Sequence, residues 1–254
     1  MSNPLAAGSL EGKRVLVTGS SRGIGADTVA YFAQAGARVV INYRNKAARA
    51  EKLARTIRDA GGTAITVAAD LTDPVSVAAL FETIVAEYGG LDLMVMNASG
   101  GMESGMAPDY AMTLNRDAQV NLLTQAIPVL SDGARVVFVT SHQAHFIATT
   151  KTMPEYEQVA RSKRAGEDAL RSVIPQLEAE GIGFVVVSGD MIEGTITATL
   201  LERANPGALS ARKDAAGRLY NVSEFAAEIA RAAVETVPQN NTRYVGDTSG
   251  FLPA

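Results

Sequence analysis

The sequence predicts a single α/β domain in which helices cover both faces of a doubly wound parallel sheet of about seven strands. Short apolar runs rich in β-branched residues recur along the chain, and longer segments with helical periodicity separate them. A glycine-rich turn joins the first apolar run to the first helical segment. A chain of 254 residues that is 47% hydrophobic can bury one large core, so residues 1–254 are expected to form one domain.

The expected strands lie at residues 14–19, 37–43, 64–70, 91–98, 134–141, 183–189 and 242–246. Helical periodicity is clearest at residues 73–88, where Asp73 is a natural N-cap and Pro74 occupies the favoured first position. The segment from about 195 to 221 is polar and interrupts the alternation of strands and helices. We expect it to cross the carboxyl edge of the sheet as a substrate lid.

The composition excludes several classes of protein. The formal net charge is -4 and the charges are dispersed, which argues against a nucleic-acid-binding surface. The absence of cysteine excludes disulfides and thiolate metal sites, and no metal site is expected. No segment reaches the roughly 20 apolar residues that a membrane span needs, and the N-terminus lacks the features of a signal peptide. A soluble cytoplasmic protein is therefore expected.

The turn after the first strand has the glycine content of a phosphate-binding loop. In the stretch TGSSRGIG, three glycines stand between a strand and a helix. Glycine permits the tight turn and lets backbone N–H groups approach a pyrophosphate at the helix N-terminus. The dinucleotide site predicted from this loop comprises Gly19, Ser21, Arg22, Gly23, Ile24 and Gly25.

The spacing T-G-x-x-x-G-x-G resembles that of the short-chain dehydrogenase/reductase family, whose members have a Rossmann-type fold. Further motifs follow in the family's order over nearly the whole chain, namely ADL, NASG, DAQVNLL and VVFVTS. The resemblance implies that a serine after the fifth strand and a helical asparagine belong to the catalytic set. It assigns cofactor contacts to Asp70, Leu71, Asn97 and Ala98, and catalytic roles to Asn121 and Ser141.

The end of the second strand indicates which nicotinamide cofactor is bound. NAD sites usually carry an acidic side chain there to accept the ribose 2′-hydroxyl, whereas a 2′-phosphate needs positive charge. The strand ends in VVINYRNK, which contains no acid, and Arg44 and Lys46 follow it. Arg22 of the glycine loop can close on the same phosphate, because an arginine binds phosphate through two hydrogen bonds. The sequence therefore predicts NADP(H) as the cofactor.

The catalytic set departs from the family pattern at the tyrosine. In the family, a serine and a tyrosine hold the substrate carbonyl, and the tyrosine transfers the proton. A lysine four residues after the tyrosine binds the nicotinamide ribose and lowers the tyrosine pKa. Counting back from the sixth strand puts Lys163 at the lysine position and Val159 at the tyrosine position. Counting forward from Ser141 instead puts Tyr156 near the separation expected for the tyrosine.

Tyr156 is a candidate proton donor, but helix geometry opposes it. Seven residues bring Tyr156 and Lys163 to within about 20° on one helix face but leave them about 10 Å apart along the axis. Helical side chains lean toward the N-terminus, which carries the Tyr156 ring away from Lys163. We therefore expect Tyr156 to act only if residues 154–158 depart from a regular helix or fold back over the nicotinamide.

Three further side chains are alternative proton donors. His142 and His145 follow the catalytic serine, and histidine titrates near neutral pH. Asp190 stands where the family has the glycine of a P-G pair, so it can assist proton transfer or bind a polar substrate. For each of the three, a solvated loop group is the alternative interpretation. Ile192 and Thr195 approximate the residues that contact the nicotinamide carboxamide in the family.

These features predict an NADP(H)-dependent short-chain oxidoreductase that reduces a ketone or aldehyde at an atypical active site. The alternative is a catalytically impaired NADP(H)-binding protein with a regulatory or assembly role, which Val159 favours. The resemblance also implies a homodimer or homotetramer formed through the helices around residues 112–130 and 154–178. The expected partner is a small-molecule carbonyl or alcohol, and a fold does not identify which one.

Overall fold

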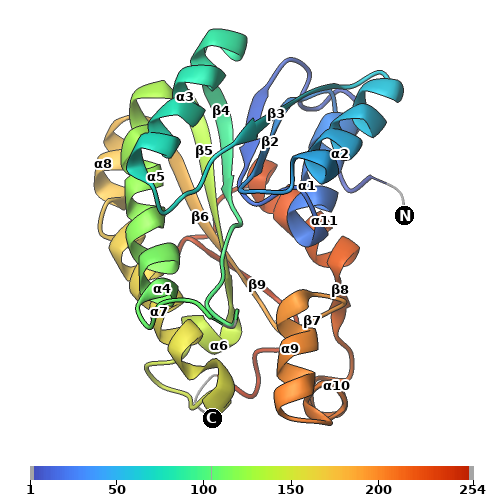
Figure 1. The fold of residues 1–254 in the computed structure, drawn as a ribbon, viewed down its shortest axis with the longest axis vertical. Helices are drawn as coiled ribbons and strands as arrows, with labels where there is room; N and C mark the ends of the chain where they lie inside the picture. Colours follow the sequence, from blue (N-terminus) through green and yellow to red (C-terminus); the bar gives the residue numbers. More distant parts are fainter. Residues whose placement is uncertain (1–2, 104, 252–254) are drawn as a thin grey trace.

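The computed structural model describes residues 3–103 and 105–251, which fold around a seven-stranded sheet in the order β3-β2-β1-β4-β5-β6-β9 (Figure 1). All neighbouring strands pair in parallel. The strands are β1 (Arg14–Val17), β2 (Arg38–Tyr43), β3 (Thr63–Ala68), β4 (Leu91–Met96), β5 (Leu130–Ser141), β6 (Gly183–Gly189) and β9 (Thr242–Val245). The predicted α/β fold with a doubly wound parallel sheet is confirmed.

Helices cover both faces of the sheet, which explains why its central strands are apolar along their whole length. One face carries α1 (Gly23–Gln34), α2 (Ala47–Asp59) and α11 (Val222–Val234), and the other carries α3 (Pro74–Tyr88), α5 (Ala118–Ala126), α7 (Pro154–Arg171) and α8 (Ile174–Ala179) (Figure 1). Shorter segments are α4 (Tyr110–Met112), the π-helical turn η1 (Thr113–Asp117), the 3-10 turn η2 (Ile127–Val129) and α6 (His142–His145). None of the helices in the described ranges is both long and apolar enough to cross a membrane. A cytoplasmic location stays a prediction.

The helix α3 begins where the sequence predicts. The side chain of Asp73 accepts the N–H of Val75 at 3.0 Å, and Pro74 is the first helical residue. The helix ends at Gly89, whose φ of 78° lies in the left-handed region that glycine adopts without strain. Local capping signals therefore suffice to fix both ends of this helix.

The strand order reverses between β1 and β4, which are neighbours in the sheet although five elements separate them in the chain. From β1 the chain proceeds to β2 on one side, and from β4 it proceeds to β5 on the other. The loops that leave these two strands diverge and open a crevice at the carboxyl edge of the sheet. In folds of this kind such a crevice is where ligands bind.

The segment expected as a lid forms two helices, α9 (Ile196–Ala204) and α10 (Ala208–Ala216). It leaves the core through the short strand β7 (Ile192–Glu193) and returns through β8 (Tyr220–Asn221), and these two strands pair with each other. Figure 1 shows α9 and α10 below the carboxyl ends of the central strands. The position of this segment agrees with the predicted excursion, while its action as a substrate lid stays a proposal.

Candidate active site

Two adjoining cavities lie at the carboxyl edge of the sheet. The larger, which we call the outer cleft, has a volume of about 640 Å³ and extends from the glycine loop past the ends of β2 and β3. The smaller, which we call the inner cavity, has a volume of about 140 Å³ and lies among β5, α7, the end of β6 and α9. Four residues line both cavities and make them continuous, namely Ile24, Asn97, Ser99 and Thr195.

The glycine loop forms one wall of the outer cleft. Gly19 and Gly23 have φ values of 62° and 56°, in the left-handed region that favours glycine. A Cβ atom on Gly25 would lie 2.7 Å from Nδ2 of Asn97, so only glycine fits where α1 approaches β4. Arg22, the N-cap of α1, gives no side-chain hydrogen bond to the first turn of the helix. The N–H groups of that turn are therefore suited to an anion such as a pyrophosphate.

The end of β2 is neutral and is surrounded by positive charge. Asn42 is buried, and its Oδ1 accepts the N–H of Gly19 at 3.1 Å. Its Nδ2 donates to two carbonyl oxygens at the end of β3, each at 3.4 Å. The basic side chains that line the cleft in this region are Arg22, Arg44, Lys46 and Arg49. This set fits a phosphate on the ribose better than a free 2′-hydroxyl, which needs an acceptor.

Arg44 is held across the mouth of the outer cleft. Its Nη1 donates to the hydroxyl of Tyr110 at 2.6 Å. Arg44 is exposed, whereas the Tyr110 ring is half-buried against the apolar cluster beneath α3 and α5. A ring fixed by packing thus orients a side chain that would otherwise be free in solvent. Sequence reasoning missed Tyr110, because no local pattern connects it with Arg44.

Each residue predicted to bind the cofactor lines one of the two cavities. The outer cleft is lined by Gly19, Ser21, Arg22, Gly23, Ile24, Gly25, Arg44, Asp70, Leu71, Asn97, Ala98 and Thr195, and the inner cavity by Lys163 and Ile192. The carboxylate of Asp70 is fixed, because its Oδ1 accepts both the N–H and the hydroxyl of Thr72 at 3.0 and 2.7 Å. The fold therefore gathers the predicted positions onto one continuous surface.

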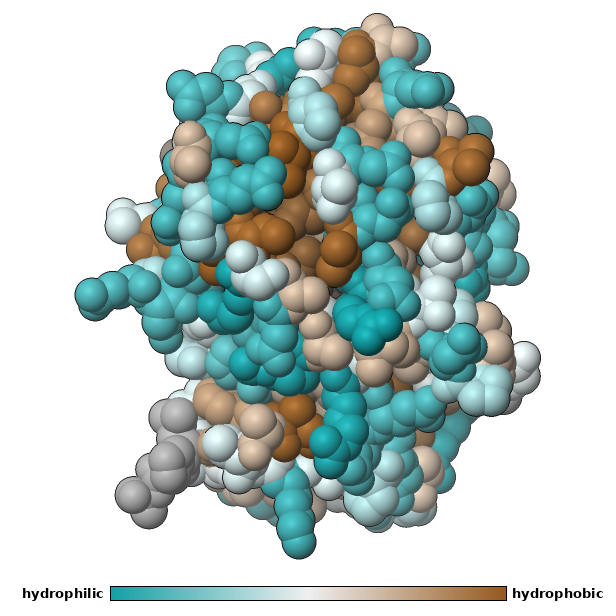
Figure 2. All heavy atoms as spheres, turned by 90° about the vertical axis from the view of Figure 1, so that its left-hand side faces the viewer, coloured by the Kyte–Doolittle hydropathy of each residue, from teal (hydrophilic) through white to brown (hydrophobic). Residues whose placement is uncertain are grey.

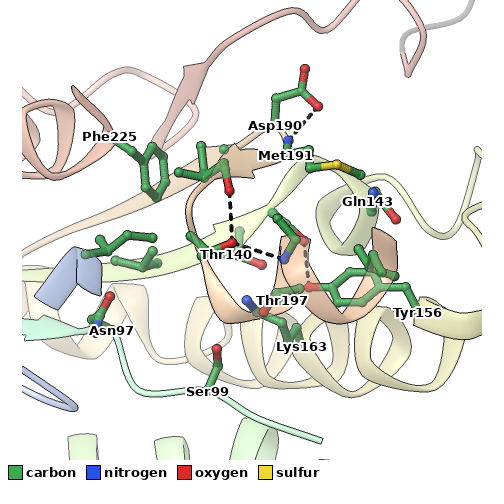
Figure 3. A pocket seen from close by; sticks show the side chains of 18 residues that line it. Asn97, Ser99, Thr140, Gln143, Tyr156, Lys163, Asp190, Met191, Thr197 and Phe225 are labelled. Atoms are coloured by element: carbon green, nitrogen blue, oxygen red, sulfur yellow. Dashed lines mark hydrogen bonds between the residues drawn. The ribbon is translucent and has the colours of Figure 1, made fainter. Parts of the chain in front are cut away.

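The inner cavity contains Ser141, Tyr156 and Lys163. Ser141 ends β5 and caps α6, where its Oγ accepts the N–H of Ala144 at 3.3 Å. The same Oγ lies 3.3 Å from the hydroxyl of Tyr156. Figure 3 shows Tyr156 and Lys163 extending from the same helix toward this cavity, with Asp190 and Met191 on its other side. Tyr156 and Lys163 are 4% and 8% exposed, so any charge on them is poorly screened by water.

A regular helix does not keep Tyr156 away from Ser141, while the role of Tyr156 as proton donor stays a prediction. The helix α7 is continuous from Pro154 to Arg171, and the Tyr156 hydroxyl nevertheless reaches Ser141. The distance along the helix between Tyr156 and Lys163 does not determine where Ser141 lies. The packing of α6 against α7 brings Ser141 beside the first turns of α7.

Val159 is buried but lines neither cavity. The loop after β4 packs on it: a Cβ atom on Gly101 would lie 3.1 Å from Cγ2 of Val159. Gly101 has a φ of 115°, and its backbone packs closely on the valine. The polar group available to the inner cavity from this part of α7 is therefore the Tyr156 hydroxyl.

The structure does not bring Asn121 to the site, and this corrects the prediction made from the DAQVNLL motif. Asn121 lines neither cavity, and its Oδ1 accepts a hydrogen bond from Nε2 of Gln125 on the same helix. Asn115, in the π-helical turn η1, faces α7 instead. Its Nδ2 donates to the carbonyl of Gly100 at 2.8 Å and to Oγ of Ser162 at 2.9 Å, beside Lys163 in the chain. Asn115 lies six positions before Asn121, and its contact with α7 depends on the packing of two helices that are distant in the sequence.

Neither histidine that follows Ser141 lines the inner cavity. His142 is fully buried, and its Nδ1 lies 2.8 Å from Oγ of Ser188. Burial lowers the pKa of His142 to about 4, so the ring is neutral at neutral pH. His145 packs against α7, where its Nδ1 lies 2.7 Å from the buried carboxylate of Glu167. Both side chains therefore have structural partners away from the cavity, which removes them as direct proton donors.

Asp190 and Gln143 also line the inner cavity. Both carboxylate oxygens of Asp190 accept hydrogen bonds from Arg212, so of the two interpretations of Asp190 the solvated loop acid is wrong. Oε1 of Gln143 accepts the hydroxyl of Thr152, which holds the amide at the rim. Gln143 stands two positions after Ser141, and its polar character alone gave no reason to select it from the sequence.

Comparisons with known proteins find relatives of the same fold and family. A family model described as short chain dehydrogenase matches residues 13–205. The short chain dehydrogenase/reductase nsrJ of Aspergillus novofumigatus is 33% identical over 204 residues, which cover 78% of this chain and 74% of that protein. The 1-cyclohexenylcarbonyl-CoA reductase of Streptomyces collinus is 29% identical over 184 residues, covering 70% of this chain and 64% of that protein. The crystal structure of the angucycline C-6 ketoreductase LanV with bound NADP is 28% identical, with a TM-score of 0.74 over 96% of this chain and 97% of that chain.

Proposed function

Because this chain belongs to the short-chain dehydrogenase family, we propose that it is an NADP(H)-dependent reductase that converts a carbonyl group to an alcohol, with Tyr156 as proton donor. The observation that carries the proposal is the Tyr156 hydroxyl, 3.3 Å from Oγ of Ser141 in a cavity that also contains Lys163. In this proposal Val159 takes the place of the family's tyrosine, and its role passes to a residue three positions earlier. Ser141 and Lys163 keep the family roles.

The proposed cofactor fits the outer cleft. The uncapped N-terminus of α1 suits a pyrophosphate, and Arg22 and Arg44 suit a 2′-phosphate near the neutral Asn42. The ketoreductase LanV, which has a similar fold, was solved with bound NADP. When bound, NADPH would supply the hydride for the reduction. Lys163, in the inner cavity, would hold the nicotinamide ribose, and Ile192 and Thr195 would border the nicotinamide.

The side chains of the inner cavity can manage the proton and the developing charge. As negative charge grows on the substrate oxygen, the Ser141 hydroxyl would donate a hydrogen bond to it and Tyr156 would give up its proton. The ammonium of Lys163 would stabilise the phenolate that remains, more strongly here than in water because both groups are buried. Asn115 would keep Lys163 in place through Ser162 and the carbonyl of Gly100.

A second candidate reaction is the reduction of a carbonyl compound that is conjugated with a carbon–carbon double bond. Moving the tyrosine from position 159 to position 156 shifts it by about 4.5 Å along the helix axis. In a conjugated substrate, hydride can add at the β-carbon, two bonds beyond the carbonyl carbon, so the oxygen lies farther from the nicotinamide. The 1-cyclohexenylcarbonyl-CoA reductase, by its name, acts on such a compound. The displaced Tyr156 fits the more distant oxygen.

The test is to assay NADPH oxidation with matched pairs of saturated and α,β-unsaturated ketones, aldehydes and thioesters, and to identify the products. Tyr156→Phe should lower kcat by a factor of about 10² to 10⁴ while leaving the Kd for NADPH unchanged, because only the proton donor is lost. Tyr220→Phe is the matched control, since this ring packs beneath Arg218 outside both cavities.

Each outcome of this assay separates the candidates. Alcohol products support carbonyl reduction, and saturated carbonyl products support the second candidate. Unchanged turnover in Tyr156→Phe would remove the tyrosine from the mechanism. NADPH binding without turnover on any compound would favour a cofactor-binding protein with a regulatory or assembly role.

We also propose that the protein forms a homodimer or homotetramer through the helical face that carries α3, α5 and α7. Figure 2 shows apolar side chains gathered among polar ones on this side of the molecule. Exposed apolar residues of its helices are Val75 and Val85 on α3 and Val120 on α5. Sedimentation analysis should show a dimer or larger species, and a monomer at micromolar concentration would contradict the proposal.

A further inference from the structure

Arg212, on α10, makes the densest set of charged contacts near the inner cavity. Its Nε donates to both oxygens of Asp190 at 2.8 and 3.0 Å, and its Nη2 donates to Oδ2 of Asp190 at 2.8 Å. The same Nη2 lies 2.9 Å from the carbonyl oxygen of Asp247 and 3.1 Å from its Oδ2. The Arg212 and Asp190 side chains are only 17% and 3% exposed. The guanidinium thus joins the α9–α10 segment to two loops at the edge of the sheet.

Asp190 is a rigid anchor for this contact. It follows β6 directly, and its N–H bonds to the carbonyl of Val245 at the end of β9. Its Oδ1 also accepts the N–H of Met191 at 2.7 Å, and Met191 lines the inner cavity. A Cβ atom on Gly246 would lie 2.9 Å from Cβ of Asp190, so the two strand ends pack closely there.

Leu209 and Ala216 of α10 pack against an apolar cluster, but the other polar contacts of this helix are weaker. The helix has no buried residue, in contrast to α9, where Ala198 and Leu201 are buried. Lys213, next to Arg212, pairs with Glu193 at 3.0 Å, but both side chains are exposed. Exposed ion pairs contribute little to stability, whereas a charge-assisted bidentate pair shielded from water is strong. Arg212 is therefore the principal polar link between α10 and the sheet.

We propose that Arg212 is a positioning residue that keeps the α9–α10 segment closed over the substrate. It acts through Asp190, and its effect reaches the substrate through the wall that α9 contributes to the inner cavity, formed by Thr197, Ala198 and Leu201. The outer cleft touches this segment only at its beginning, from Gly194 to Ile196. Loosening α10 should therefore weaken substrate binding and leave cofactor binding nearly unchanged.

The experiment compares Arg212→Ala with Lys213→Ala, its neighbour on the same helix. We expect Arg212→Ala to raise the substrate KM by about tenfold or more, because several hydrogen bonds to charged groups are lost. The value of kcat should stay within about threefold and the Kd for NADPH within about twofold. A contact that stabilises the bound substrate and the transition state equally changes only KM when it is lost. Lys213→Ala should change none of the three.

A second measurement does not depend on turnover. Limited proteolysis with chymotrypsin should cleave within residues 196–217 faster in Arg212→Ala than in the unaltered protein or Lys213→Ala, because an opened segment exposes its leucines. Arg212→Lys, which keeps the charge but loses the parallel N–H groups, should give intermediate values in both measurements. This variant and Asp190→Asn decide the question if Arg212→Ala does not fold.

The kinetic measurements rest on the proposed function, whereas the proteolysis does not. If no substrate is turned over, the proposed function fails and the cleavage rates alone test Arg212. Equal cleavage rates in Arg212→Ala and Lys213→Ala would overturn the inference. An unchanged substrate KM in a folded, active Arg212→Ala or Arg212→Lys protein would overturn it as well.

Discussion

At the scale of single residues, the inner cavity depends on a contact that a spacing rule could not anticipate. The separation between Tyr156 and Lys163 argues against cooperation when only the helix is considered. The contact between Tyr156 and Ser141 arises instead from the packing of α6 on α7, between residues 15 positions apart. By contrast, the predicted place of the glycine loop between a strand and a helix is confirmed, because strand, turn and helix are contiguous there.

Tyr110 gives a test of cofactor discrimination at this scale. Tyr110→Phe removes the hydroxyl that holds Arg44 at the mouth of the outer cleft. The Kd for NADPH should rise by about fivefold, since one hydrogen bond that orients a charged group is lost, while the Kd for NADH should not change. Fluorescence titration with both nucleotides measures this.

Arg44→Gln is the reference for that titration, because it removes the charge itself and should abolish most of the preference for NADPH. A similar loss of affinity for both nucleotides in Tyr110→Phe would show that the ring shapes the cleft generally and does not act through Arg44.

At the scale of elements, α7 and the π-helical turn η1 together set the geometry of the site. A Cβ atom on Gly166 would lie 2.0 Å from the carbonyl oxygen of Asn115, so these two backbones meet only because residue 166 is glycine. Helical periodicity predicts α7 but gives no sign of the π-helical turn, which inserts a residue into the helix register. Asn115, six positions before the predicted Asn121, is the asparagine that contacts Ser162 across this interface.

Gly166→Ala tests this contact between elements. The added methyl group must push α7 away from η1, and overpacking of this kind costs about 1 to 3 kcal/mol. We expect a loss of unfolding free energy in that range in urea denaturation, accompanied by reduced turnover. Gly133→Ala is a control for backbone strain alone, because its φ of 74° is unfavourable for alanine but nothing lies within 4 Å of the added atom.

A Gly166→Ala protein that is as stable and active as the unaltered one would show that α7 has room to move. That result would remove the close approach of α7 and η1 as a determinant of the site.

At the scale of the whole molecule, the core behaves as hydrophobic patterning predicts. The seven strands of the sheet were all located from their apolar runs, since strands buried on both faces leave a continuous signal. The two helices of the excursion were not recognised, because α10 buries no residue and therefore has no clear apolar stripe. Burial also determines how the stability of the fold depends on pH.

His142 should make the protein sensitive to mild acid. Burial lowers its pKa to about 4 in the folded state, whereas the unfolded value is about 6.5. As the pH falls, the unfolded chain therefore binds the proton first. The contribution of the neutral His142 ring to the free energy of unfolding is complete above pH 6.5 and decreases as the pH falls toward 4. A shift of this size corresponds to about 3 kcal/mol of unfolding free energy.

The measurement is urea denaturation of the protein without cofactor between pH 4 and 8. His142→Gln should have lower stability at pH 7.5 but a flatter dependence between pH 6.5 and 4, because it lacks the titrating ring. Parallel curves for the two proteins would mean that His142 is protonated in the folded state at no cost.

The pairing of β7 with β8 allows the sequence of the α9–α10 excursion to vary independently of the main sheet. Because these two strands lie side by side, the chain enters and leaves the α9–α10 excursion at almost the same place. The excursion is thus an insertion whose two ends are held together, and its length or sequence can vary without disturbing the register of the main sheet. Exchange of residues 194–219 between relatives should therefore transfer substrate preference as a cassette, provided that an arginine matches the carboxylate at position 190.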